Sequence, residues 1–308
     1  MLRTILTFVI GTTLLGAIAL TGCRSDESGG GGPDIVVTTA QAADMVRNVA
    51  GSDADVTQIL PANADPHEYE PTPSDAEALA GADLIVRSGG EVDEWLDQLI
   101  ESSGTDAPVL TLSDHVRLIE DDGGTDPHWW QDPRNAVAAV AAIRSELDRI
   151  DPGSARAFDA DARRYSAEIE RLDRAIAECI DRVPAERRKL VTSHDALGYY
   201  ADRYGLDVIG AAIPALSTQA QASAGETADL IDLIRAEDVG AIFPEVGVSP
   251  DLEEAIAAEA GARIGGRLWA DTLGPEGTAA ATYLGSLRSN TEAIVDGLSD
   301  GTVRCRLR

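Results

Sequence analysis

The sequence predicts an α/β fold in which two mostly parallel-sheet lobes are joined by a long rigid helix. One observation is an alternation of short β-branched runs with helical patterns, which begins at Asp34 and resumes after Pro184. This order is typical of parallel strands covered by helices. Another is that residues 136–183 are helical in pattern, apart from one break. A chain of 308 residues is also long enough for about two domains.

The strands expected in each lobe are short runs rich in Val, Ile and Leu. They cover residues 35–39, 56–60, 84–86 and 109–111 in the first lobe, and 190–192, 208–209, 241–243 and 263–269 in the second. The helices between them have apolar side chains at helical spacing. They cover residues 41–50, 74–80 and 92–100 in the first lobe, and 199–204, 226–237 and 276–298 in the second.

The middle of the chain predicts two helices. Residues 133–150 form the first, and the sequence Asp-Pro-Gly at 151–153 interrupts the pattern before a long helix over residues 154–183. The long helix has one apolar stripe, because its apolar side chains recur every three or four residues. They are Tyr165, Ile169, Leu172, Ile176 and Ile180. About thirty residues at 1.5 Å each would span roughly 45 Å, so we expect a rigid strut between the lobes.

The first 22 residues predict a secretory signal rather than a part of the fold. Arg3 precedes an apolar run over residues 5–20, which contains Gly and Thr and is short for a membrane span. The sequence Leu-Thr-Gly-Cys at 20–23 matches the bacterial lipobox, in which the cysteine is lipidated and becomes the new N-terminus. We therefore expect Cys23 to anchor an extracytoplasmic protein to the cell membrane. The alternative is a plain signal peptide with a chance cysteine.

These observations divide the chain into five expected segments. They are the signal peptide (1–22), a Gly-rich flexible tether (23–33), the N-terminal lobe (34–135), the linking helical region (136–183) and the C-terminal lobe (184–308). Two cysteines remain in the mature chain, Cys179 and Cys305. Disulfides persist outside the cytoplasm, so these two can pair. The alternative is two unpaired thiols.

The charge balance narrows the classes of partner. The chain has 25 Lys and Arg against 53 Asp and Glu, a formal net charge of −28. This excess argues against nucleic acid or an anionic membrane surface as the main partner, because both repel an acidic protein. A cationic ligand is compatible with the charge.

Three of the four histidines lie shortly after an expected strand or just before an expected helix. His67 and His128 each close the tripeptide Asp-Pro-His, in which Pro stiffens a non-helical segment. His194 directly follows the strand at 190–192, and Asp271 follows the strand that ends at Trp269. In open α/β sheets, ligands bind beyond the carboxyl ends of strands. We therefore expect these four residues to converge at the cleft between the lobes, and we take His115 as a surface residue.

Three imidazoles and one carboxylate form a plausible tetrahedral set for a divalent metal. Imidazole nitrogen suits zinc, whereas manganese prefers more oxygen ligands. Other side chains near these positions are expected to support the ligands rather than to bind the metal: Glu68, Glu245, Trp129 and Trp269. The tryptophans would exclude water from the site, although they are equally consistent with ordinary core aromatics.

Four segments resemble, in order, the motifs of the zinc- and manganese-binding lipoproteins that serve metal ABC importers. They are DPHEYEPTPSD at 65–75, DPHWWQDP at 126–133, TSHDALGYY at 192–200 and WADTLG at 269–274. The resemblance implies two α/β lobes on a rigid helix, with a metal ion held between them and handed to a membrane permease. His at position 194 resembles the zinc members, because manganese members typically have Glu there. We therefore expect Zn²⁺ as the transported ligand, a monomer, and no catalytic residues.

The chain departs from this family pattern in two places. Residues 118–125 (LIEDDGGT) are short, whereas many zinc members have a long His-rich loop there. Cys305 resembles the C-terminal cysteine of zinc members, but no cysteine lies near Ala241, where its usual partner would be. Cys179 would have to supply an alternative pairing.

The main competing function is a zinc-dependent hydrolase that uses the same ligands. A catalytic zinc usually keeps one position open to water, whereas three histidines and Asp271 would close the site. The motif H-E-x-x-H is absent, and no nucleophile-elbow sequence surrounds Ser193. A manganese- or iron-specific binding protein of the same family is the other alternative.

Overall fold

The computed structural model of the protein describes residues 31–121 and 124–307. The predicted signal peptide, Cys23 and most of the predicted tether lie outside the described residues. Within the described ranges, no helix combines the length and the apolar character that are needed to cross a membrane.

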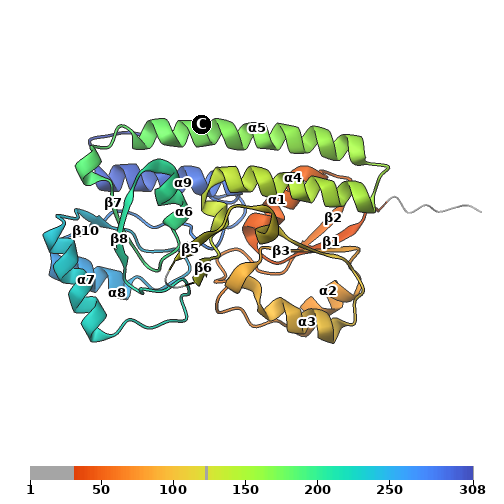
Figure 1. The fold of residues 1–308 in the computed structure, drawn as a ribbon, viewed down its shortest axis with the longest axis horizontal. Helices are drawn as coiled ribbons and strands as arrows, with labels where there is room; N and C mark the ends of the chain where they lie inside the picture. Colours follow the sequence, from red (N-terminus) through yellow and green to blue (C-terminus); the bar gives the residue numbers. More distant parts are fainter. Residues whose placement is uncertain (1–30, 122–123, 308) are drawn as a thin grey trace, which may run out of the picture. The chain divides into compact units, whose positions relative to one another are not determined.

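The N-terminal part is built on a four-stranded parallel sheet in the order β2-β1-β3-β4 (Figure 1). Its strands are β1 (Asp34–Val37), β2 (Asp55–Gln58), β3 (Leu84–Arg87) and β4 (Val109–Thr111). Side chains alternate between the two faces of a strand. Ile35 and Val37 therefore join the core beneath α1, α4 and α5, whereas Val36 packs with Leu79 and Leu96 on the opposite face.

Five helices cover this sheet or continue from it. They are α1 (Ala40–Ala50), α2 (Pro73–Ala80), α3 (Trp95–Ser103), α4 (Pro133–Ile150) and α5 (Ala155–Ile180). Figure 1 shows α2 and α3 on one face and α1, α4 and α5 toward the other. The predicted apolar stripe of the long helix is confirmed, because Tyr165, Ile169, Leu172, Ile176 and Ile180 are all buried in the largest core.

The C-terminal part contains two short pairs of parallel strands. They are β7 (Lys189–Thr192) with β8 (Asp207–Ala211), and β9 (Ala241–Ile242) with β10 (Arg263–Ile264). A bridge from Thr192 to Phe243 joins the pairs, and another from Glu245 to Leu268 extends the second pair. The helices are α6 (Gly198–Tyr204), α7 (Ala224–Ala236), α8 (Asp251–Ala260) and α9 (Tyr283–Leu298). The strands of the C-terminal part therefore lie in the order β8-β7-β9-β10.

Several expected elements are shorter than the sequence pattern indicates. The expected strand at 263–269 stops at Ile264, because Gly266 adopts a φ of 143° that an extended strand does not use. The expected helix at 276–298 begins only at Tyr283, where the Thr282 hydroxyl accepts a hydrogen bond from the Gly285 backbone N–H. The expected helix at 92–100 is split into a 3-10 helix, η1 (Gly90–Asp93), and α3.

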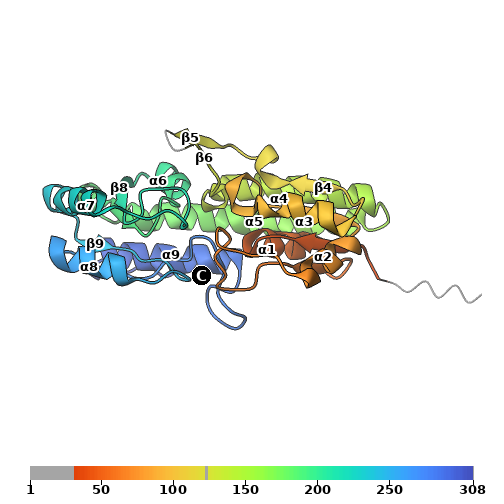
Figure 2. The ribbon, with the colours of Figure 1, turned by 90° about the horizontal axis from the view of Figure 1, so that it is seen from below.

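Other elements were not expected from the sequence. Helix α8 is one, and a two-stranded antiparallel hairpin of β5 (Ile119–Asp121) and β6 (Gly124–Asp126) is another. Figure 2 shows this hairpin extending away from the sheets. Three more 3-10 helices are η2 (Leu112–His115), η3 (Trp129–Gln131) and η4 (Ala185–Arg187).

A disulfide joins the long helix to the end of the chain. Cys179, near the end of α5, is bonded to Cys305, and their Cα atoms lie 5.7 Å apart. The two residues are 126 positions apart in sequence. Closing a loop of this length stabilises a fold by about 4–5 kcal/mol at most in the chain-entropy model. The C-terminal segment is thereby attached to the helix that packs against both parts.

Candidate metal centre

Four side chains that follow strands meet between the N-terminal and C-terminal parts. His67 lies in the loop between β2 and α2, and His128 immediately precedes η3. His194 follows β7. Asp271 comes shortly after Leu268, which forms a β-bridge with Glu245. All four residues are buried, with exposed fractions of 8% or less. The predicted convergence of the four residues is therefore confirmed.

The two Asp-Pro-His tripeptides form the same tight turn. The backbone N–H of His67 donates to Oδ1 of Asp65 over 2.9 Å, and that of His128 donates to Oδ1 of Asp126 over 2.9 Å. An aspartate that accepts from the residue two positions later is the usual Asx-turn, and the intervening proline restricts the backbone. The sequence motif therefore sets the local direction of both imidazoles.

The polar atoms of the cluster face one another. Nε2 of His194 lies 3.1 Å and Nε2 of His67 lies 3.3 Å from Oδ2 of Asp271. Nε2 of His128 lies 3.5 Å from Oδ1 of Asp271 and 3.2 Å from Nε2 of His194. One ligand atom from each residue lies within 4.8 Å of all the others.

This arrangement fits a divalent cation. His67 Nε2 and both carboxylate oxygens of Asp271 are buried without a hydrogen-bond partner. Such atoms destabilise a fold unless something satisfies them. Metal–ligand bonds of about 2.0–2.1 Å at tetrahedral angles place the ligand atoms about 3.3 Å apart. Four separations in the cluster, measured to either Oδ1 or Oδ2 of Asp271 or between two Nε2 atoms, are 3.1–3.5 Å and so are close to that value. With their burial and unpaired atoms, the four residues form a metal site.

Two further carboxylates form hydrogen bonds with the Nδ1 atoms of His128 and His194, the ring nitrogens that face away from the centre. Oδ1 of Asp126 lies 2.7 Å from Nδ1 of His128, and Oε2 of Glu245 lies 2.7 Å from Nδ1 of His194. A ligating histidine commonly donates its other N–H to a carboxylate, which fixes the tautomer and the ring orientation. Nε2 of both histidines is thereby left for the metal. The predicted supporting position of Glu245 corresponds to this contact.

Neighbouring charges in the cluster shift the pKa values of His194 and Asp271. Burial lowers the pKa of His194, but Glu245 and Asp271 outweigh burial and hold it well above the usual value. Burial raises the pKa of Asp271, but His194 and His128 outweigh burial and hold it well below the usual range. The metal-free cluster therefore favours protonated imidazole beside a carboxylate anion. Because a metal ligand must be deprotonated, protons and metal compete for this site.

The segment that carries Asp271 is fixed by the N-terminal part. The indole N–H of Trp130 and the side-chain amide of Gln131 donate to the carbonyl oxygen of Ala270 over 2.9 and 2.8 Å. The Gln41 amide also reaches this oxygen, over 3.4 Å. These donors fix the peptide group that precedes Asp271, so its carboxylate is aimed by residues next to His128.

The other residues that the sequence analysis singled out differ in their contacts and in their exposure to solvent. The ring that packs against His128 belongs to Trp130, with centroids 5.5 Å apart, whereas the Trp129 indole N–H donates to the Ser88 carbonyl. Trp269 is only partly buried, and its backbone is bonded to Asn290. Glu68 is exposed beside His67. His115 is exposed, as expected.

Sequence reasoning missed Asp126, Gln131 and Gln41 as supports of the ligands. The shared Asp-Pro-His tripeptide offered a signal for Asp126, because an Asp two positions before a histidine can cap its backbone. No local signal identifies Gln41, which lies 229 residues from the carbonyl that it contacts.

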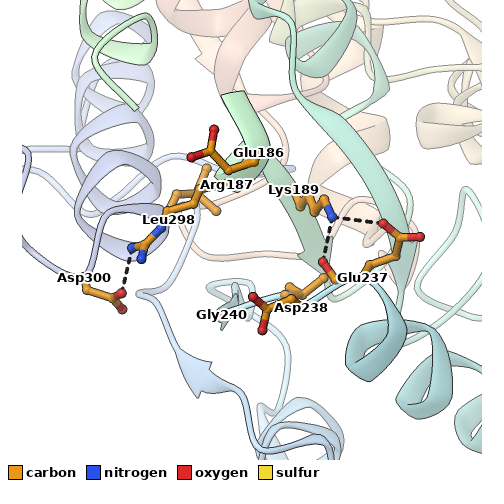
Figure 3. Close-up of a pocket in the computed structure, with 9 residues that line it drawn as sticks. Glu186, Arg187, Lys189, Glu237, Asp238, Gly240, Leu298 and Asp300 are labelled. Atoms are coloured by element: carbon orange, nitrogen blue, oxygen red, sulfur yellow. Dashed lines mark hydrogen bonds and ion pairs between the residues drawn. The ribbon is translucent and has the colours of Figure 1, made fainter. Parts of the chain in front are cut away.

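A separate cavity of about 350 Å³ lies near the start of β7 (Figure 3). Figure 3 shows that both basic side chains of its lining pair with acidic ones: Lys189 with Glu237 over 2.9 Å, and Arg187 with Asp300 over 2.8 Å. None of the four metal ligands lines it. This cavity is therefore separate from the metal centre.

Parallel α/β parts with a closed four-ligand site between them define a protein that holds a metal rather than one that uses it in catalysis. Residues 35–297 match the family described as zinc-uptake complex component A, periplasmic. The chain is 32% identical over 289 residues to the manganese-binding lipoprotein MntA of Halalkalibacterium halodurans, covering 92% of this chain and 95% of that protein. It is also 32% identical over 283 residues to the zinc-binding protein TroA of Treponema pallidum, covering 89% and 91%.

A solved structure of the periplasmic zinc-binding protein TroA from Treponema pallidum has the same fold. Its TM-score is 0.81 at 30% identity, covering 87% of this chain and 99% of that chain. The chain therefore belongs to the family of the zinc-uptake complex component A. It is an extracytoplasmic, non-enzymatic, metal-binding substrate protein of an ABC importer.

We expect the substitution His128→Ala to abolish tight metal binding. It removes one of four ligands, so the loss should exceed the 10–100-fold that is typical of losing a supporting residue, on the order of 1,000-fold. Competition with a chromophoric chelator measures the affinity of the stripped protein. His115→Ala is the matched control and should bind as the parent does. Wild-type affinity in His128→Ala, or a large loss in His115→Ala, would contradict the ligand set.

Proposed function

We propose that the protein captures Zn²⁺ outside the cytoplasm and delivers it to the membrane permease of a metal ABC importer. The donor set carries this proposal: three imidazoles and one carboxylate whose ligand atoms lie within 4.8 Å of one another. Imidazole suits zinc, which commonly takes four ligands, whereas manganese favours carboxylate, carbonyl and water oxygens. The buried position supports retention, because few water molecules can compete with the ligands.

Manganese is the second candidate. The relatives carry both names, since the manganese-binding MntA and the zinc-binding TroA are each 32% identical to this chain. Overall similarity therefore does not discriminate between the two metals. The chemistry of the ligands favours zinc, since a single carboxylate among them leaves little oxygen coordination.

Elemental analysis of the mature domain, followed by titration of the stripped protein, tests the choice of metal. We expect about one zinc per chain, and we expect Zn²⁺ to displace Mn²⁺ when both are offered at equal concentration. Equal preference, or retention of manganese against zinc, would overturn the zinc assignment and leave a metal-binding protein of different specificity.

Glu245 is proposed to tune the affinity of the site through His194. The substitution Glu245→Gln keeps the size of the side chain but removes its charge, so the imidazole becomes a weaker donor to the metal. We expect zinc affinity to fall about 10–100-fold. Glu253→Gln is the matched control, because Glu253 is a buried glutamate on α8 that makes no hydrogen bond to the four ligands. Equal losses in the two variants would assign the effect to burial rather than to His194.

Cys23 is proposed to carry the lipid that holds the protein at the membrane, with the Gly-rich tether between it and the folded part. Intact mass spectrometry of membrane-extracted protein should give a mature chain that begins at Cys23 and carries acyl groups. Cys23→Ala should move the protein out of the membrane fraction. An unmodified Cys23 in membrane-bound protein would contradict the anchor.

A further inference from the structure

His67 reaches the metal centre from a loop whose central residues make their hydrogen bonds to the other part of the protein, whereas Ala64 and Tyr69 pack on the N-terminal core. We call residues 59–72, between β2 and α2, the His67 loop. Its first residues continue the sheet, since Ile59 and Leu60 donate to the carbonyls of Val37 and Thr38. In the described structure, residues 61–68 make hydrogen bonds outside the loop only with the C-terminal part. The position of this ligand therefore depends on contacts made across the cleft.

Two side chains make these contacts. The hydroxyl of Thr218 donates to Oδ2 of Asp65 over 2.7 Å, and the side-chain amide of Gln219 donates to the carbonyl oxygen of His67. The other oxygen of Asp65 accepts from the backbone N–H of His67. Both backbone polar groups of His67 are thus fixed through Thr218 and Gln219, one indirectly and one directly. A longer contact, from Asn63 N to the Leu273 carbonyl over 3.3 Å, supplements them.

The two Asp-Pro-His turns differ in this respect. In the second turn, Asp126 accepts from both the backbone N–H and Nδ1 of His128, so that histidine is held by its own segment. In the first turn, the second carboxylate oxygen of Asp65 accepts a hydrogen bond from Thr218 rather than from His67. The same sequence motif therefore positions His128 through hydrogen bonds within its own turn, whereas the turn of His67 also depends on hydrogen bonds from the C-terminal part.

Thr218 and Gln219 are themselves connected to another ligand. They lie in residues 213–221, which we call the latch segment, between β8 and α7. Ile213 N donates to the Ser193 carbonyl over 2.7 Å, and Asp195 N donates to the Ala215 carbonyl over 3.0 Å. These bonds join the latch segment to both neighbours of His194. The segment therefore links the third ligand of the chain to the first.

We propose that Thr218 and Gln219 are positioning residues that latch the His67 loop over bound metal and set the rate at which the metal leaves. This inference rests on the proposed capture function. The other three ligands have supports that do not involve the His67 loop: Asp126, Glu245 and the donors to Ala270. Opening the latch therefore removes one ligand while three stay in place. Gln219 is exposed and accessible from outside, whereas Thr218 is buried.

The test compares metal dissociation rates of purified, metal-loaded full-length variants. Thr218→Val keeps the shape but removes the donor, Thr218→Ser restores it, and Gln219→Ala removes the second contact. Gln221→Ala is the matched control, because Gln221 is exposed on the same segment and makes no side-chain hydrogen bond among the described residues. Release of Zn²⁺ to excess chelator is followed by stopped-flow absorbance, and the association rate is measured separately.

We expect Thr218→Val and Gln219→Ala each to release zinc about tenfold faster, as the loss of one hydrogen bond predicts. Thr218→Ser and Gln221→Ala should release it at the parent rate. Hydrogen exchange of the His67 loop should quicken in the metal-loaded Thr218→Val variant.

An unchanged dissociation rate in both variants would overturn the latch, as would equal acceleration in Thr218→Ser and Thr218→Val. A change confined to association would also overturn it. Failure of the parent protein to bind zinc is a separate result, seen before any variant is compared, and it would reject the proposed function instead.

Discussion

The structure depends on one electrostatic constraint: a carboxylate is buried among three imidazoles without a hydrogen-bond partner for either of its oxygens. Burying a charge in a protein is unfavourable unless it is paired and hydrogen-bonded. In the metal-free state, despite burial, Asp271 raises the pKa of His67, and Glu245 and Asp271 raise the pKa of His194, so these two imidazoles favour the protonated form beside the carboxylate. A divalent cation answers the constraint better, because one ion at the centre contacts all four ligand atoms. The same constraint explains why the ligands come from both parts, since only the packed interface buries them all.

The rest of the architecture fixes the ligands around that centre. The long helix α5 packs its apolar stripe against both parts, and a disulfide attaches the last residues of the chain to its end. Carboxylates form hydrogen bonds with Nδ1 of two histidines. The carbonyl oxygen of Ala270 accepts hydrogen bonds from side chains of the N-terminal part. Support is uneven, because His67 is held chiefly by the latch segment, whereas the supports of the other three ligands do not involve the His67 loop. Rigid support for three ligands and a separable fourth would let a carrier protein bind tightly and still release its metal.

Much of this could be predicted from sequence, because the signals are local. The helix over residues 133–150 is bounded by Asp132 and by an Asp-Pro-Gly sequence, and it appears with those bounds. The four ligands could be predicted because His67, His194 and Asp271 follow expected strands, and because His67 and His128 share an Asp-Pro-His turn. Other features depend on contacts distant in sequence. Nothing near Trp130 distinguishes it from Trp129 as the ring against His128, and Thr218 lies 153 residues from the aspartate that it contacts. Gly266 ends the expected strand at 263–269 through its positive φ, which the sequence pattern alone does not reveal.

The central claim is that His67, His128, His194 and Asp271 together hold one metal ion. Anomalous X-ray diffraction from crystals of zinc-loaded protein, collected on both sides of the zinc absorption edge, tests it most directly. The account predicts a single anomalous peak within about 2.0–2.3 Å of the three Nε2 atoms and of an Asp271 oxygen. A peak bound by other residues, or loaded protein in which one of the four side chains points away from the ion, would contradict it.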